Sequence, residues 1–242
     1  VAKAMTVMAA GDLAYKKLTG DATLTTEVAG ETTDSGEQVA AFADTIKLRG
    51  TGAYKLGAVR STAGEVTVDN GDNGLQVATL QAPKGDVTVT SGAATVNQLT
   101  AGGGMTATVD SLALAQGTVG GPFDANVADL ADVGRLDVGG EATVTAGRLQ
   151  MDQATVGNSL EGTVRGLADL TQLETGGGVT LEAGALELDQ GTVGGAFQAT
   201  TEARNGRDGH QTFGQVDVAK AMTVMAAGDL AYKKLTGDAT LT

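Results

Sequence analysis

A short alternating motif recurs along the chain: an apolar residue, a threonine and a second apolar residue, as in Val66-Thr67-Val68 and Val87-Thr88-Val89. The central residues of the clearest copies are Thr6, Thr67, Thr88, Thr106, Thr143, Thr180 and Thr223. Their separations are close to whole multiples of a unit of about 20 residues. Alternate side chains of a strand face opposite sides, so the apolar residues share one face and threonine takes the other. The motif therefore predicts short, half-buried strands.

Glycine separates these strands so often that little room is left for helices. We expect the glycines to supply turns with positive φ. A unit of about 20 residues accommodates three short strands and three turns, but it buries its apolar face only by stacking on neighbouring units. The sequence predicts an all-β fold, a right-handed parallel β-helix (β-solenoid) with coils of about 20 residues. Val, Leu, Ala and Met would line its interior, and Thr, Asp, Glu and Gln would form outward columns.

A longer repeat contains the short one. Residues 218–242 are identical to residues 1–25, which gives a period of 217 residues. We interpret residues 1–217 as one full repeat of roughly 11 coils and residues 218–242 as the start of the next identical repeat. Two polar stretches, 25–45 and 200–214, interrupt the rhythm and are predicted to be loop excursions from the coil.

Composition narrows the possible functions. The 242 residues include 37 Gly, 2 Pro and only 3% aromatic residues, which suits a narrow core. The formal net charge of −13 disfavours binding to nucleic acid, since phosphate recognition needs clustered Lys and Arg. The absence of Cys excludes disulfides and thiolate chemistry. No apolar run has the 18 or so residues of a membrane span, so no membrane insertion of this segment is expected.

The phrasing of residues 80–121 (LQAPKGDVTVTSGAATVNQLTAGGGMTATVDSLALAQGTVGG) and 173–195 (LETGGGVTLEAGALELDQGTVGG) resembles the filamentous haemagglutinin family of secreted β-helical adhesins, and bacterial giant-adhesin repeats more generally. The resemblance implies export to the bacterial cell surface and a role as stalk or adhesin. It transfers no functional residue, because the family's repeats carry none by motif.

One turn contains candidate metal ligands. The segment 69–74 reads Asp-Asn-Gly-Asp-Asn-Gly, and Asp69 and Asp72 could supply oxygen ligands to Ca²⁺. The remainder of an EF-hand loop is missing, and Asn-Gly pairs are ordinary turn formers. An ordinary turn and a weak Ca²⁺ site are therefore both open, and no other cofactor is expected. The only histidine, His210, lies in a polar stretch with Arg204, Arg207 and Asp208, which favours a solvated loop.

These observations favour a structural repeat of a long extracellular bacterial filament or adhesin, acting as a rigid rod or self-associating fibre. The expected partner is the chain itself, through end-to-end stacking of repeats and lateral bundling, with residues 218–242 docking on the coil of residues 26–60 of the following copy. One alternative is an adhesive module whose excursions contact a glycan or protein on a host or neighbouring cell. Another is a β-helical polysaccharide-degrading enzyme, but the carboxylates are scattered through turns, so no enzyme activity is expected.

Overall fold

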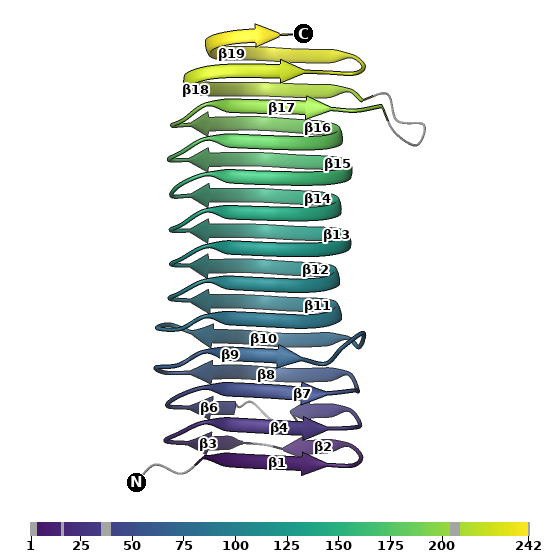
Figure 1. Ribbon diagram of the computed structural model, residues 1–242, viewed down its shortest axis with the longest axis vertical. Helices are drawn as coiled ribbons and strands as arrows, with labels where there is room; N and C mark the ends of the chain where they lie inside the picture. Colours follow the sequence, from purple (N-terminus) through teal and green to yellow (C-terminus); the bar gives the residue numbers. More distant parts are fainter. Residues whose placement is uncertain (1–3, 16, 35–39, 204–208, 242) are drawn as a thin grey trace. The chain divides into compact units, whose positions relative to one another are not determined.

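The computed structural model describes residues 4–15, 17–34, 40–203 and 209–241. The chain is an all-β parallel solenoid whose coils contain about 19 residues, which confirms the predicted fold class and coil length. Nineteen strands and no helix are found among the described residues. The chain divides into two compact units, residues 1–121 and 122–242. Figure 1 labels the strands of both units.

The first unit contains the strands β1 (Met5–Ala9), β2 (Leu13–Tyr15), β3 (Leu18–Gly20), β4 (Leu24–Val28), β5 (Thr32–Asp34), β6 (Ala40–Phe42), β7 (Ile46–Gly50), β8 (Tyr54–Ser61), β9 (Val66–Asp69), β10 (Leu75–Ala82), β11 (Val87–Ala101) and β12 (Met105–Val119). The second unit contains β13 (Phe123–Val138), β14 (Ala142–Val156), β15 (Leu160–Thr175), β16 (Val179–Val193), β17 (Phe197–Thr201), β18 (Gln211–Met225) and β19 (Leu230–Leu241).

Parallel pairing in register stacks each coil of the first unit on its neighbour. Val87 of β11 is the register partner of Val66 in β9 and of Met105 in β12. The same register places the motif threonines Thr67 and Thr88 side by side, and Thr106 follows. The inward column at the start of the coils runs Met5, Leu24, Ile46, Val66, Val87 and Met105. The predicted stacking of the motif is therefore confirmed in this unit.

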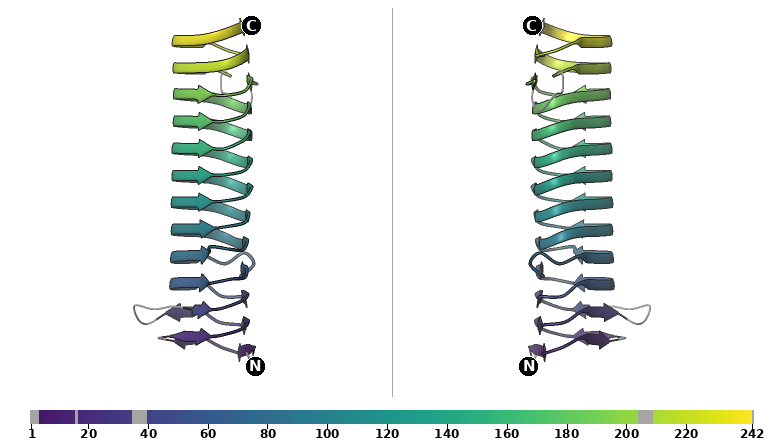
Figure 2. Two further views of the ribbon diagram at one scale, coloured as in Figure 1. Left: turned by 90° about the vertical axis from the view of Figure 1, so that its left-hand side faces the viewer. Right: turned by 90° about the vertical axis from the view of Figure 1, so that its right-hand side faces the viewer.

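The second unit follows the same rule. Its equivalent inward column runs Phe123, Ala142, Leu160, Val179, Phe197 and Met222. Thr143, Thr180 and Thr223 occupy the outward column next to it. In the two side views of Figure 2, the strands of each unit lie as parallel layers. Eleven coils start from Met5 up to Phe197, before Met222 begins the second copy, in agreement with the roughly 11 predicted for the long repeat. The handedness of the winding stays a prediction.

Strand β12 shows how one coil turns its corners. Its inward residues form three short runs, because two adjacent non-inward residues occur at Asp110-Ser111 and again at Ala115-Gln116. Each such pair shifts the in–out alternation by one position and ends a face. The three predicted faces are thus present, but two of the three corners lie inside one continuous strand. Only the third corner, which begins at Gly120, interrupts the strand.

The core contains the expected Val, Leu, Ala and Met side chains, together with aromatic rings that the pattern did not indicate. Tyr54 is buried, and so are all four phenylalanines, Phe42, Phe123, Phe197 and Phe213. Small residues in the adjacent coils make room for them. Phe42, for example, has Gly20 and Ser61 as its register partners. Phe197 and Phe213 meet edge to face with ring centroids 5.8 Å apart.

The expectation that the corner glycines adopt positive φ is wrong for most of them. Among the described glycines, only Gly71, Gly209 and Gly237 have positive φ. The corner glycines are instead needed for close approach between coils. A Cβ on Gly176 would lie 2.2 Å from the carbonyl oxygen of Gly157, and one on Gly194 would lie 2.4 Å from that of Gly176. Stacked coils leave no space for a side chain at this corner.

The two predicted excursions contain both strand and loop. Within residues 25–45, β5 and β6 pair in parallel with β8, and residues 35–39 lie outside the described part of the chain. Within residues 200–214, the chain leaves the coil between β17 and β18, and residues 204–208 are outside the described part. The register partners Phe197 and Met222 are consequently 25 positions apart.

The two identical segments differ in their strands and in their surroundings, since β1, β2 and β3 of the first copy correspond to parts of β18 and β19 in the second. Met222 begins a coil that lies on β17, and it is 1% exposed. Met5, at the same place in the first copy, is 39% exposed, and among the described residues β1 pairs only with β4. The register also differs, since Met5 faces Leu24 whereas Met222 faces Ala239. A shift of two residues keeps every side chain on its own face.

Candidate functional site

The turn that contains the candidate calcium ligands follows strand β9. Asp69 is the last residue of the strand and Asp72 is exposed in the turn. Asn70, between them, is fully buried, and its side-chain amide donates a hydrogen bond to the carbonyl of Gly74 at 2.9 Å. Since Asn70 faces inward, its carboxamide is not available on the side where Asp69 projects.

Asn73 holds the other half of the turn. Its side-chain amide donates to the carbonyls of Thr51, at 2.9 Å, and of Asn70, at 3.0 Å. Its backbone N–H also donates to the Asn70 carbonyl, at 3.2 Å. Gly71 supplies the positive φ, 58°, that the turn requires. Hydrogen bonds within the chain therefore account for this conformation. Within the described residues, no cluster of three or more His, Asp or Glu side chains could hold a metal ion.

We expect calcium to leave the stability of the chain unchanged. A site on the folded chain with a Kd in the millimolar range or below would raise Tm when about 5 mM CaCl₂ is added, because the ligand binds only the folded state. A turn held by its own hydrogen bonds gives no such rise. Thermal unfolding with CaCl₂ and with EDTA measures the difference, and Asp72→Asn is the control. A calcium-dependent rise that this variant abolishes would establish the site.

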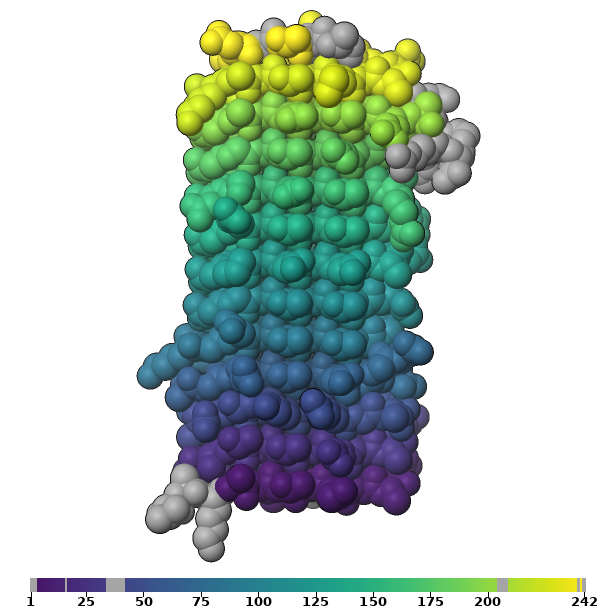
Figure 3. Space-filling model, viewed as in Figure 1, coloured from purple at the N-terminus to yellow at the C-terminus, as the bar shows by residue number. Residues whose placement is uncertain are grey.

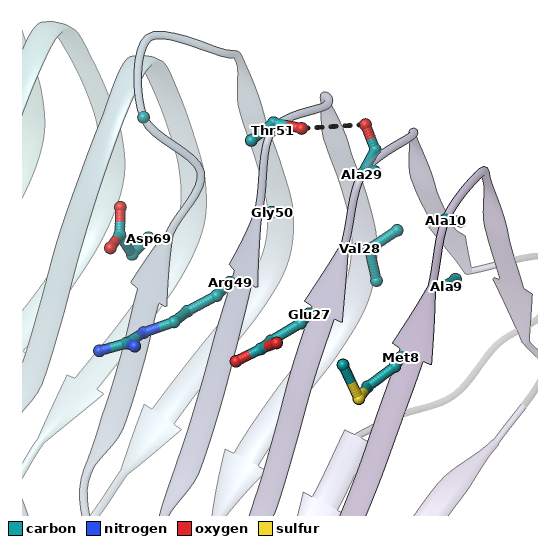
Figure 4. A pocket seen from close by; sticks show the side chains of 11 residues that line it. Met8, Ala9, Ala10, Glu27, Val28, Ala29, Arg49, Gly50, Thr51 and Asp69 are labelled. Atoms are coloured by element: carbon teal, nitrogen blue, oxygen red, sulfur yellow. Dashed lines mark hydrogen bonds between the residues drawn. The ribbon is translucent and has the colours of Figure 1, made fainter.

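A shallow groove of about 830 Å³ crosses four successive coils of the first unit (Figure 4). Met8, Glu27, Arg49 and Asp69 lie in one outward column along it, as register partners on β1, β4, β7 and β9. Small residues form the rest of its lining, and the Thr51 hydroxyl donates to the carbonyl of Ala29 at 3.0 Å. The groove therefore combines an apolar floor with alternating charges, which suits contact with a polar partner.

An uninterrupted column of glutamines lies on the second unit. Gln153, Gln172, Gln190 and Gln215 are successive register partners on β14, β15, β16 and β18. Side chains in such a column repeat at about 4.8 Å, the spacing at which stacked amides can form hydrogen-bonded ladders. The amide of Gln215 donates to Asp217 at 3.1 Å. This column was not predicted from the sequence, although Gln153 and Gln190 occupy equivalent places in two similar segments 37 residues apart.

Acidic side chains gather beside this column. Asp169 and Glu187 are register partners on β15 and β16. Burial raises the pKa of Asp169, and the negative charges of Glu187, Asp189 and Asp152 raise it further. The outer surface of the second unit therefore holds a carboxyl group that takes up a proton more readily than an isolated aspartate does.

The space-filling view shows the side chains of successive coils in stacked layers (Figure 3).

Asp169→Asn is expected to stabilise the chain at neutral pH. Because the folded state raises the pKa of Asp169 above its ordinary value, the folded chain binds the proton more tightly. The free energy of unfolding therefore falls as pH rises through the interval between the two values. The variant removes this loss, and we expect its Tm at pH 7 to exceed that of the parent by about 1–2 °C. The advantage should vanish below about pH 4, where the parent carboxyl is protonated.

Thermal unfolding measured from about pH 3 to about pH 8 tests this prediction, because this range begins below the ordinary aspartate pKa and extends well above it. Asp132→Asn is the matched control, because Asp132 lies in the same outward column but has the neutral Gln150 as its register partner. A gain in stability that does not depend on pH would contradict the electrostatic explanation.

His210 lies at the end of the second excursion, half exposed, with its Nε2 atom 3.5 Å from Glu187 Oε1. The predicted neighbours Arg204, Arg207 and Asp208 lie outside the described residues. Buried polar groups join the two described ends of this excursion. The Thr201 hydroxyl donates to the Gly209 carbonyl, and the Gln211 amide donates to the Thr201 hydroxyl at 3.1 Å.

Comparison with protein-family models, with curated protein sequences and with solved structures gives no match. Among the residues that the structure describes, no helix could cross a lipid bilayer.

Proposed function

We propose that the chain is a structural repeat of a long extracellular bacterial surface filament or adhesin, in which identical repeats stack end to end. The observation that carries this proposal is the junction between the two copies. Residues from Val218 onward repeat the start of the chain, and they continue the stack of the second unit through the pairings of β18 with β16 and β17. A new repeat thus begins inside the stack of paired coils, at a point where the pairing of β18 with β19 shifts register between Asp217 and Ala221.

The interior supports a mechanical role. The start of each coil contributes one apolar side chain to a continuous column, and neighbouring coils are joined by parallel backbone ladders. A solenoid of this kind gains stability from each interface between neighbouring coils. Its open end is an unpaired strand edge, which a following repeat would cover. Repeats of identical sequence supply length without a new interface at each junction.

Covalent tandem chains of one, two and three 217-residue copies test the proposal. Eleven coils at a rise of about 4.8 Å predict that each added copy lengthens the particle by roughly 50 Å in negative-stain images. Thermal unfolding should also shift upward with copy number, because the fraction of coils at open ends decreases. Copies that appear as separate beads on a flexible string would overturn the proposal.

The alternative is an adhesive module that binds a glycan or protein through the excursion between β17 and β18. The buried Gln211–Thr201–Gly209 contacts, which join the two described ends of this excursion, favour it. Replacing residues 203–208 with a short Gly-Ser linker separates the two functions, since a spacer keeps cell adhesion and a binding module loses it. We propose no catalytic activity, and a reducing-sugar assay on acidic polysaccharides is expected to give no product.

A further inference from the structure

Polar atoms without a protein partner gather in the core of the first unit. Within the described part of the chain, five buried side-chain oxygens make no hydrogen bond. Four of them belong to this unit: Thr32 Oγ1, Tyr54 OH, Asn70 Oδ1 and Ser91 Oγ. Buried polar atoms are nearly always hydrogen-bonded to protein or to ordered water, because leaving one unpaired costs free energy. Each of these oxygens therefore calls for a partner that the chain itself does not supply.

Three of these groups follow one another along the first corner of successive coils. The residues Gly50, Asn70 and Ser91 come directly after the register partners Arg49, Asp69 and Thr90. Gly50 has no side chain, and the Tyr54 hydroxyl fills its place, because a Cβ on Gly50 would lie 2.5 Å from the Tyr54 oxygen. The inner side of this corner thus carries a hydroxyl, a carboxamide and a second hydroxyl on three neighbouring coils.

The same corner is apolar on both sides of this polar run. Val28 is the register partner of Gly50 (Figure 4), and Val109 is that of Ser91. In the second unit, the equivalent corner column consists of Val127, Ala146, Val164 and Ala183. A polar side chain is therefore not required for the chain to turn here, and the polar run is a particular feature of these coils.

We infer that two buried water molecules bind at this corner, one between Tyr54 and Asn70 and the other between Asn70 and Ser91. Equivalent groups on neighbouring coils are about 4.8 Å apart. This separation is too long for a direct hydrogen bond, but one water molecule that makes two bonds of about 2.8 Å spans it. The Asn70 carboxamide oxygen has two lone pairs and can accept from both waters, while its amide donates to the Gly74 carbonyl at 2.9 Å.

Water suits these groups better than a metal ion does. The corner offers neutral oxygens in small number, whereas Ca²⁺ takes about six to eight oxygen ligands, carboxylates among them. A buried water needs only about two to four polar partners. Burial raises the pKa of Tyr54, and the hydroxyls of Thr26 and Thr32 lower it in part, so the Tyr54 oxygen lies in a dry pocket beside two further hydroxyls.

A crystal structure of the full chain that resolves ordered water tests the inference directly. Density is expected at two positions, each within hydrogen-bond distance of Asn70 Oδ1. Tyr54→Phe should remove the first water and Ser91→Val the second, since valine fills this place in the next coil. Direct hydrogen bonds among the side chains with no density between them would overturn the inference, and so would a peak with the coordination of a metal ion.

Thermal unfolding provides a second measurement. Tyr54→Phe and Ser91→Val change groups that lie two coils apart, roughly 10 Å, where effects on stability normally add. The two waters share the Asn70 oxygen, so the second substitution leaves this atom without any partner. We expect the fall in Tm of the double variant to exceed the sum of the single effects by about 2 °C.

Tyr54→Phe combined with Thr90→Val is the matched control, because Thr90 precedes Ser91 and lies on the other side of the strand. The effects of this pair should add. Additive effects for Tyr54→Phe with Ser91→Val as well would overturn the inference. A rise in Tm with Tyr54→Phe alone would also overturn it, since that variant would then only remove an unpaired hydroxyl. The inference is independent of the proposed function, because neither result bears on the lengthening of tandem chains.

Discussion

Gly176→Ala is expected to lower the free energy of unfolding by about 3 kcal/mol, a large effect for a single methyl group. Gly176 lies at the corner between β15 and β16, and its added Cβ would be 2.2 Å from the carbonyl oxygen of Gly157. The Gly176 N–H donates to the Val156 carbonyl at 2.9 Å, so the two coils cannot separate without losing this hydrogen bond. The clash is with backbone, which has no rotamer by which to move away.

Gly74→Ala provides the matched control, because a Cβ there would find its nearest neighbour, the Ala93 carbonyl oxygen, at 3.8 Å. We expect this variant to change the free energy of unfolding by less than about 0.5 kcal/mol. Urea unfolding followed by circular dichroism measures both. If the two variants had equal effects, the loss of glycine itself, and not the close approach of two coils, would explain the result.

The stacking, the coil length and the outward threonine columns could be predicted because they depend on local alternation and on spacing. Thr67 and Thr88 are 21 residues apart and share one column, which needs only a repeated coil of nearly constant length. The role of the corner glycines could not be predicted in the same way. Turns with positive φ and close contacts between coils both require glycine, and only the distance between Gly176 and Gly157 distinguishes them.

The interior positions of polar and aromatic residues also could not be predicted from the alternation of apolar and polar residues. Asn70 and Gln211 occupy inward places that neighbouring coils fill with other residues, such as Leu186 and Leu230 around Gln211. Asn70 donates to the Gly74 carbonyl of its own turn, whereas Gln211 donates to the Met225 carbonyl of the following coil, a partner that one segment of sequence does not reveal. A phenylalanine in a narrow core likewise depends on a small residue about one coil away, as Phe42 does on Gly20.

The candidate site was predicted only in part. Asp69 and Asp72 do lie at one turn, as their spacing of three residues implied, and whether they bind calcium stays a prediction. The glutamine column could not be predicted from the alternating pattern because its members lie at the second corner of each coil, where the in–out alternation shifts. The separations within the column are irregular, since Gln190 and Gln215 lie on either side of an excursion.

The second large effect is expected from the same substitution, methionine to alanine, made separately in each copy of the repeated sequence. Met222→Ala should lower the free energy of unfolding by about 3 kcal/mol, the usual cost of removing most of a buried methionine side chain. Met5→Ala should lower it by less than about 0.5 kcal/mol. Met222 is held between β17 and β19, whereas Met5 has a register partner only in β4 among the described residues.

Because both methionines stand in the same local sequence, effects on the unfolded chain are nearly the same for the two variants. The difference between them therefore measures what a preceding coil contributes. Urea unfolding at low protein concentration provides the comparison, and its repetition at high concentration detects association. Equal losses for the two variants at high dilution would contradict the prediction, since they would mean that Met5 is covered within the single chain. Losses that become equal only at high concentration would mean that a second molecule covers Met5.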